Sequence, residues 1–124
     1  MTLGSLQHVN IRCADLEKAR LFYVGIGLQE GDRPPFASTG HWLYAKGMPI
    51  IHLVQAAPAE RADGAGTGAI DHIALAADGL DEMRSTLARR GIAYEEMRVP
   101  RDNIVQILVR DPDGVRIELN YPEA

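Results

Sequence analysis

Three histidines and one glutamate are the residues of this sequence whose types and spacing point to chemistry. His8 and His72 each stand third in a short alternating run, LQHVNI and IDHIAL, and His52 and Glu118 each stand third in a later run, IIHLV and RIELN. Imidazole nitrogens and carboxylate oxygens together bind borderline divalent ions at about 2.0–2.2 Å. The four residues are therefore candidate ligands for one divalent ion: Zn²⁺, Ni²⁺, Fe²⁺, Co²⁺ or Mn²⁺.

An internal duplication relates these four positions to one another. Each histidine-bearing first strand is followed by a helix and then by three further strands. The duplication matches His8 with His72 and His52 with Glu118. If the sheets curve around a common cleft, all four side chains point at one spot.

The sequence thus predicts an α+β fold of two βαβββ modules whose curved mixed sheets form a metal-binding cleft. Residues 1–124 form one domain, with module one at about 5–55, a linker at 56–69 and module two at about 70–121. The linker is rich in Ala and Gly and without periodicity, so we expect it to be mobile.

Capping and turn residues place the individual elements. Asp15 is a good N-cap for the first helix, and Gly91 ends a second helix over residues 80–90. The strands after each helix are expected at 28–33, 42–45, 50–54, 93–99, 105–110 and 115–120. The last two strands of each module are joined by matching turns, at 46–48 and 111–114.

Side chains alternate between the two faces of the first strand. The apolar set expected beneath the helix is Val9, Ile11 and Cys13. The opposite set, which is expected to face the cleft, is His8, Asn10 and Arg12. Asn10 and Arg12 are either solvated strand residues or substrate contacts, and an arginine suits a small oxygenated anion that chelates the ion. Cys13 falls on the helix side and is expected to be inert core.

Composition excludes several classes of function. Lys and Arg total 13 against 17 Asp and Glu, a formal net charge of -4, which argues against binding to nucleic acid or to anionic membranes. No apolar stretch approaches the roughly 18 residues needed to cross a bilayer, and the N-terminus lacks the pattern of a signal peptide. The single cysteine cannot form an internal disulfide. We expect a soluble domain located in the cytoplasm.

Each candidate ligand taken alone has an ordinary explanation. A strand histidine is usually a hydrogen-bonded core or surface residue, and Glu118 between two apolar neighbours would suit the exposed face of an edge strand. Only the coincidence at duplicated positions, in a chain with four histidines, favours a shared metal site. The fourth histidine, His41, has no counterpart in the repeat and is expected on the surface.

The chain resembles the vicinal oxygen chelate superfamily. The resemblance rests on the paired modules, on His8, His72 and Glu118, and on the segments LFY and GL near residues 21–28 and RDPDG before the last strand. Members include glyoxalase I, methylmalonyl-CoA epimerase, extradiol dioxygenases and fosfomycin or bleomycin resistance proteins. The resemblance covers nearly the whole chain and is specific for fold and metal rather than for the reaction.

Similarity to glyoxalase I implies metal ligands on the first and last strands of both modules: His8, His52, His72 and Glu118. That family has Glu where His52 stands, or Gln in the epimerase. The resemblance implies a lyase or isomerase in which the ion polarises a carbonyl and stabilises an enediolate while Glu118 moves the proton. Arg12 matches an arginine that helps hold glutathione, whereas Ala56 replaces an asparagine of that site, which argues against glutathione itself.

Three other functions within the family remain as alternatives. An extradiol dioxygenase would use two histidines and Glu118 on Fe²⁺ or Mn²⁺, with His52 as an acid–base group. Against it, Leu108 stands at the position of that family's active-site tyrosine, and its further histidine is absent from 98–101. A drug-sequestering protein of the bleomycin type generally lacks the ligands, and a fosfomycin-type transferase usually needs a basic potassium-binding cleft.

His52 separates the two enzyme readings. It is a ligand in the lyase and an acid–base group beside the ion in the dioxygenase, and its match with Glu118 favours the ligand role. We also expect a homodimer, because both modules leave open sheet edges that a second copy can cover. The cleft then forms either within one chain or between two.

Overall fold

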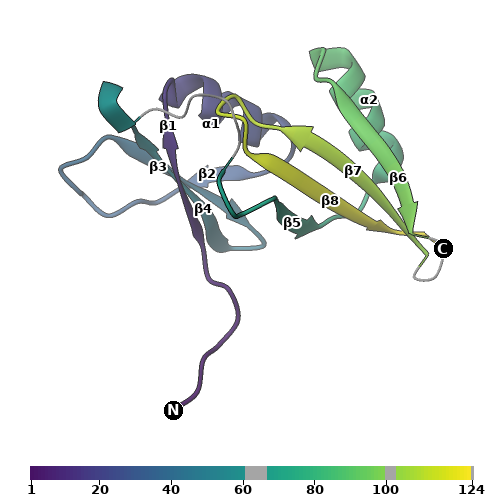
Figure 1. The fold of residues 1–124 in the computed structure, drawn as a ribbon, viewed down its shortest axis with the longest axis horizontal. Coiled ribbons are helices and arrows are strands. Elements are labelled where there is room, and N and C mark those ends of the chain that lie inside the picture. The colour runs from purple at the N-terminus through teal and green to yellow at the C-terminus, as the bar shows by residue number, and fades with distance from the viewer. Residues whose placement is uncertain (61–66, 100–102, 124) are drawn as a thin grey trace. The chain divides into compact units, whose positions relative to one another are not determined.

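A computed structural model describes residues 1–60, 67–99 and 103–123 (Figure 1). The chain divides into two compact units, Met1–Arg61 and Ala62–Ala124. Each unit is built from one helix and one four-stranded sheet.

The first unit contains one βαβββ module. Its elements are β1 (Val9–Cys13), α1 (Leu16–Gly25), β2 (Gln29–Gly31), β3 (Gly40–Ala45) and β4 (Met48–Gln55), followed by a 3-10 turn over Pro58–Glu60. The strand order is β1-β4-β3-β2, with β1 parallel to β4 and the remaining pairs antiparallel.

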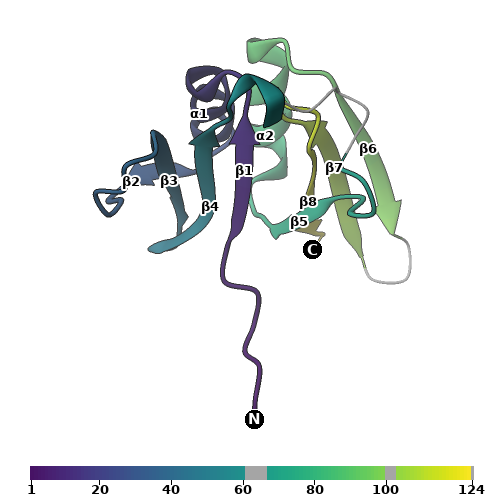
Figure 2. The ribbon, with the colours of Figure 1, turned by 60° about the vertical axis from the view of Figure 1, so that its left-hand side comes forward.

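The second unit repeats this arrangement. Its elements are β5 (Ile73–Ala76), α2 (Leu80–Arg90), β6 (Tyr94–Val99), β7 (Ile104–Arg110) and β8 (Arg116–Pro122). The order β5-β8-β7-β6, with β5 parallel to β8, is the order of the first sheet, and both sheets can be followed in Figure 2. The predicted α+β class and the duplicated βαβββ module are confirmed.

Some element boundaries differ from the prediction. Strands β1 and β5 begin at Val9 and Ile73, so His8 and His72 each stand directly before a strand rather than inside it. Part of the predicted linker is ordered, because Pro58–Glu60 forms a 3-10 turn in which Glu60 accepts a hydrogen bond from the Ala57 backbone amide. The rest of the prediction that the linker is mobile falls largely on residues 61–66, outside the described ranges.

Local signals explain where the helices begin and end. The Asp15 carboxylate accepts a hydrogen bond from the Lys18 backbone amide at 3.1 Å and thereby caps α1. Helix α2 has no side-chain cap, but acidic residues occupy its first turn and basic residues its last turn, which complements the helix dipole. Gly91 follows with φ 67°, the left-handed conformation that ends a helix most readily at glycine.

Two short turns set the register of the hairpins that carry the candidate ligands. Between β3 and β4, only Lys46 and Gly47 form the loop, both with positive φ. Between β7 and β8, the Asp111 carboxylate accepts hydrogen bonds from the backbone amides of Asp113 and Val115, both at 2.8 Å.

Each unit has its own apolar core under its helix. In the first unit, the apolar faces of β1, β3 and β4 are buried together with α1, at Ile11, Cys13, Leu43, Ile51, Leu53, Ala19 and Tyr23. In the second unit, the most deeply buried side chains are Leu87, Ile107, Val109, Ile117 and Tyr121. The prediction that Cys13 is a core residue is confirmed. Among the described residues, no helix has the length and apolar character needed to span a membrane.

Candidate functional site

The two parallel strand pairs have the same register around the candidate ligands. Asn10 pairs with His52 in the first sheet, and Ala74 pairs with Glu118 in the second. His8 and His72 each precede the paired residue of their own segment by two positions. The duplication therefore brings His8 beside His52 in one unit and His72 beside Glu118 in the other.

In the first unit the two histidines form part of a stack of rings. The His8 and His52 rings are parallel, with centroids 4.0 Å apart and 11° between the planes. Trp42, the residue opposite His52 in the β3–β4 ladder, stacks on His52 at 4.0 Å and 10°. His52 lies between these two rings and is only 8% exposed.

Hydrogen bonding and burial fix the protonation state of His52. Its Nε2 lies 3.0 Å from the carbonyl oxygen of Pro49, and because a carbonyl can only accept, Nε2 carries the proton. Burial lowers the pKa of His52, and the charges of His8 and Arg33 add to this effect, whereas the hydrogen bond to Pro49 opposes it. Burial thus favours the neutral ring, in which the lone pair of Nδ1 is available to a metal ion.

The stacked geometry limits how the two rings can share an ion. The lone pairs of imidazoles lie in the ring planes, so two parallel stacked rings do not aim at one point between them. His8 is exposed, and its Nδ1 lies 3.3 Å from the side-chain oxygen of the adjacent Gln7. Rotation of the His8 side chain is thus the movement that would bring both rings onto one ion.

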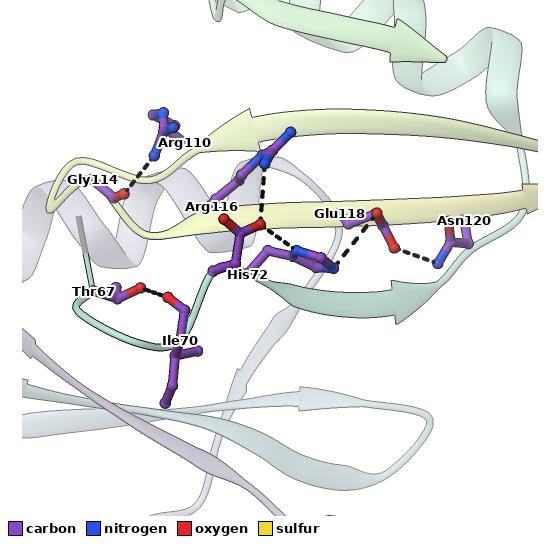
Figure 3. A network of polar contacts seen from close by, with 9 residues as sticks. Thr67, Ile70, His72, Arg110, Gly114, Arg116, Glu118 and Asn120 are labelled. Atoms are coloured by element: carbon purple, nitrogen blue, oxygen red, sulfur yellow. Dashed lines mark hydrogen bonds and ion pairs between the residues drawn. The ribbon is translucent and has the colours of Figure 1, made fainter. Parts of the chain in front are cut away.

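In the second unit a carboxylate lies on each side of the histidine. His72 Nδ1 lies 2.8 Å from the Asp71 carboxylate, so Nδ1 donates and the lone pair resides on Nε2. Nε2 lies 3.7 Å from Glu118 Oε1 (Figure 3). Two donors that bind one ion at about 2.1 Å lie at most about 4.2 Å apart, so this pair is compatible with a shared ion.

Further polar residues hold this pair in place. Asn120 Nδ2 donates to Glu118 Oε2 at 3.1 Å, and Gln106 Nε2 donates to Asn120 Oδ1 at 3.0 Å. Figure 3 shows Glu118 between His72 and Asn120. The hydrogen bond from His72 lowers the pKa of Asp71, and Arg116, 3.2 Å away, adds to that effect. Histidines that bind metal ions commonly donate their other ring N–H to a carboxylate, which fixes the orientation of the ring.

The described ranges 1–60, 67–99 and 103–123 contain no group of three His, Cys, Asp or Glu side chains placed to hold a metal ion. The four predicted ligands form two pairs, one in each unit. That all four bind one ion stays a prediction.

The predicted substrate contacts occupy different surroundings. Asn10 lines a cavity of about 510 Å³ in the first unit, together with His8 and His52. Arg12 is not among the lining residues; its side chain is 67% exposed and lies 3.8 Å from Glu60. A role for Arg12 in binding the substrate stays a prediction.

Two residues of this cavity, Trp42 and Arg33, were not identified from the sequence. Trp42 could have been found by pairing the two predicted strands through the 46–48 turn, which sets it opposite His52. Arg33 ends the strand predicted at 28–33, but β2 ends at Gly31, so Arg33 lies in the irregular segment before β3 and was not singled out. His41, expected on the surface, is 27% exposed in its side chain and lies 2.7 Å from Glu30.

The chain was compared with known proteins. It is 31% identical over 125 residues to the uncharacterized protein YwkD of Bacillus subtilis, covering 96% of this chain and 98% of the relative. Among solved structures, TnmS3, an antibiotic binding protein from Streptomyces sp. CB03234, is 26% identical with a TM-score of 0.71, covering 99% of both chains. A mutant of FosX, a fosfomycin resistance protein from Listeria monocytogenes, was solved with Mn(II) and 1S,2S-dihydroxypropylphosphonic acid. It is 19% identical with a TM-score of 0.74, covering 98% of this chain and 94% of that one.

A model of a protein family also matches the chain. The model of the Glyoxalase/Bleomycin resistance protein/Dioxygenase superfamily matches residues 5–119, nearly the whole chain and both modules. This family includes metal-dependent enzymes as well as proteins that bind antibiotics. The chain belongs to the Glyoxalase/Bleomycin resistance protein/Dioxygenase superfamily.

Proposed function

We propose that this protein is a divalent-metal-dependent enzyme of the glyoxalase I type, a lyase or isomerase that acts on a small oxygenated anion. The observation that carries the proposal is the pair formed by His72 and Glu118. Asp71 orients the His72 ring so that the Nε2 lone pair faces the Glu118 carboxylate at 3.7 Å. The Mn(II) complex of the structurally similar FosX supports a divalent ion in this fold.

We propose His8, His52, His72 and Glu118 as the ligands of one ion. Three neutral imidazoles and one carboxylate suit Zn²⁺, Ni²⁺, Fe²⁺, Co²⁺ or Mn²⁺. A bound ion would supply Lewis-acid polarisation of a substrate oxygen.

The proton transfer is assigned to Glu118. Its side chain is 14% exposed, and the hydrogen bond from Asn120 holds Oε2 while Oε1 stays on the side of His72. In an isomerisation next to a carbonyl, this carboxylate takes the proton from one carbon and returns it to the neighbouring carbon, so no oxidant is consumed. Asn10 and Arg12 are proposed to contact the substrate.

An extradiol dioxygenase is the second candidate, and the surroundings of His52 favour it. A buried ring that already donates to Pro49 suits an acid–base group beside the ion as well as a ligand. Against this candidate, Leu108 pairs with Glu118 at the position where a tyrosine is expected.

The metal content of the purified protein tests both enzyme proposals. We expect about one divalent ion per chain by elemental analysis after dialysis. Less than about a tenth of an equivalent, with no rebinding of Ni²⁺, Zn²⁺ or Fe²⁺, would contradict the metal site itself.

Aerobic and anaerobic assays with each metal then separate the reactions. Turnover of a hemithioacetal that needs no O₂, on Ni²⁺ or Zn²⁺, supports the glyoxalase type. O₂ consumption with catechols on Fe²⁺ identifies the dioxygenase instead. Full metal occupancy with neither activity favours a resistance or binding protein of the same family.

We also propose that the protein is a homodimer. Strands β1, β2, β5 and β6 are the end strands of their sheets, and end strands offer unpaired backbone groups to a second copy. Sedimentation at micromolar concentration should show a species of twice the chain mass, and a strict monomer would contradict the proposal.

A further inference from the structure

The cavity of the first unit has the features of a small-molecule site. Its volume of about 510 Å³ falls within the range of about 300–1,000 Å³ that is usual for ligand pockets. The rings of Phe36, Trp42 and His52 line it, with Met48 and Pro49 adding further apolar surface. None of the described residues that line the cavity is acidic.

Arg33 gives this cavity a fixed positive charge. Its Nη1 and Nη2 donate to the Ser38 carbonyl at 2.9 Å and to the Ser38 hydroxyl at 3.0 Å, and its Cζ lies 5.2 Å from the centre of the Phe36 ring. These contacts hold the guanidinium in one place. Each terminal nitrogen still has a second N–H, because a guanidinium carries five donors and Ser38 uses two of them.

Arg33 forms no ion pair with any of the described residues. No carboxylate there lies within ion-pair distance of it, and its buried Nε has no hydrogen-bond partner among the same residues. Gly40 makes room for the group, because a Cβ there would lie 3.0 Å from Nη2 and 2.3 Å from the Leu53 carbonyl oxygen. An arginine that is held in place beside a cavity but not neutralised favours an anionic ligand.

We propose that this cavity binds a small aromatic carboxylate, with Arg33 paired to the carboxylate and the apolar wall around Trp42 in contact with the ring. His8 and His52 line the same cavity, so the bound molecule lies beside two of the proposed metal ligands. Its role as substrate rests on the proposed function, whereas its binding does not. In this cavity the carboxylate is assigned to Arg33, because Arg12 does not line it.

Trp42 is the only tryptophan of the chain, so its fluorescence reports directly on this cavity. Metal-free protein is titrated with benzoate, with benzamide as the neutral analogue and with acetate, which lacks the ring. Free N-acetyltryptophanamide is titrated in parallel to measure collisional quenching. We expect saturable binding of benzoate that is at least about tenfold tighter than binding of benzamide, because the pairing with arginine is charge-assisted, and no saturation with acetate. Equal affinity for benzoate and benzamide, or no saturation with either, overturns the proposal.

Two matched variants assign the charge to one arginine. Arg33→Gln should remove the preference for benzoate over benzamide, whereas Arg20→Gln, at an α1 arginine that pairs with Glu17 and does not line the cavity, should retain it. The opposite pattern, or a preference that survives in Arg33→Gln, overturns the assignment. Circular dichroism verifies that each variant folds. If Arg33→Gln does not fold, Arg33→Lys takes its place. The lysine should weaken the binding of benzoate, because it lacks the planar guanidinium that donates two hydrogen bonds to a carboxylate.

The two proposals fail in different measurements. Stoichiometric metal without benzoate binding contradicts only the assignment of the ligand class. Saturable benzoate binding by a protein that binds no metal contradicts only the proposed enzyme.

Discussion

The two units share one backbone plan but surround their candidate ligands with opposite chemistry. In the first unit, His52 lies between the parallel rings of His8 and Trp42, and its Nε2 donates to the Pro49 carbonyl oxygen. In the second, His72 lies between the carboxylates of Asp71 and Glu118. The strand register around the two pairs is nevertheless the same.

The residues across the strands contribute to this difference. Trp42 lies opposite His52 and stacks on it, whereas Leu108 lies opposite Glu118, and Asn120, on the same strand as Glu118, donates to its carboxylate. The duplication thus preserves the strand register, and the neighbouring residues set the chemistry around each candidate ligand. On the proposed function, the second unit supplies the negative charge and the base, and the first supplies neutral donors and the shape of the cavity.

The largest effect on metal affinity and turnover is expected from removing the negative charge of Glu118 in the second unit. Glu118→Gln keeps the size of the side chain but removes a ligand charge and the proposed base. We expect metal affinity to fall by about 100-fold or more and turnover by about 10³-fold. Calorimetric titration with Zn²⁺ or Ni²⁺ measures the first effect. Glu95→Gln, an exposed carboxylate on β6, is the control and should change neither.

A ligand role in the first unit is tested by His52→Ala. If Nδ1 of His52 binds the ion, metal affinity falls by about 10-fold or more, and activity falls with occupancy. If His52 is an acid–base group, the variant keeps a full metal complement and loses about 10²–10⁴ in rate. We expect the first result. His41→Ala removes an imidazole that pairs with Glu30 away from these ligands and should leave affinity unchanged.

Asp71→Asn tests the carboxylate that the first unit lacks. An asparagine weakens the hold on His72 Nδ1, and we expect metal affinity to fall by about tenfold, because outer carboxylates orient ligand histidines. Arg116→Gln removes the ion pair to the same carboxylate and should have little effect, since exposed pairs contribute little. An equal loss in both variants would mean that Asp71 acts through Arg116 rather than through His72.

The smallest effect concerns the core of the second unit. The Tyr121 hydroxyl is buried without a hydrogen-bond partner among the described residues, and burial raises its pKa to about 12. Tyr121→Phe removes this unsatisfied group, so we expect the free energy of unfolding to rise by about 1 kcal/mol. Urea denaturation measures the change, and Tyr94→Phe, on the exposed side of β6, should stay within about 0.5 kcal/mol of the parent.

Much of the fold could be predicted from the sequence because its signals are local. Alternation places Ile11 and Cys13 in the core, Asp15 caps α1, and Gly91 ends α2. The repeat matches His8 with His72 and His52 with Glu118, and the two parallel strand pairs carry these positions in the same register.

The surroundings of the candidate ligands could not be predicted in the same way. Asp71 is adjacent to His72 in the sequence, but only the direction of both side chains reveals their hydrogen bond. Arg33 reaches the cavity from the irregular segment before β3, although the sequence places it at the end of a predicted strand. Contacts between side chains of unlike elements carry the chemistry here, and no pattern in the order of residues encodes them.

The two-residue loop at Lys46 and Gly47 has a consequence for how such a chain tolerates insertions and deletions. Successive strand residues face opposite sides, so one residue added to this loop, with the β3 ladder kept, would turn β4 over. His52 would then enter the core, and Ile51 or Leu53 would face the cavity. Loop length, set by two residues that touch no ligand, therefore governs whether an imidazole or an aliphatic group faces the cavity.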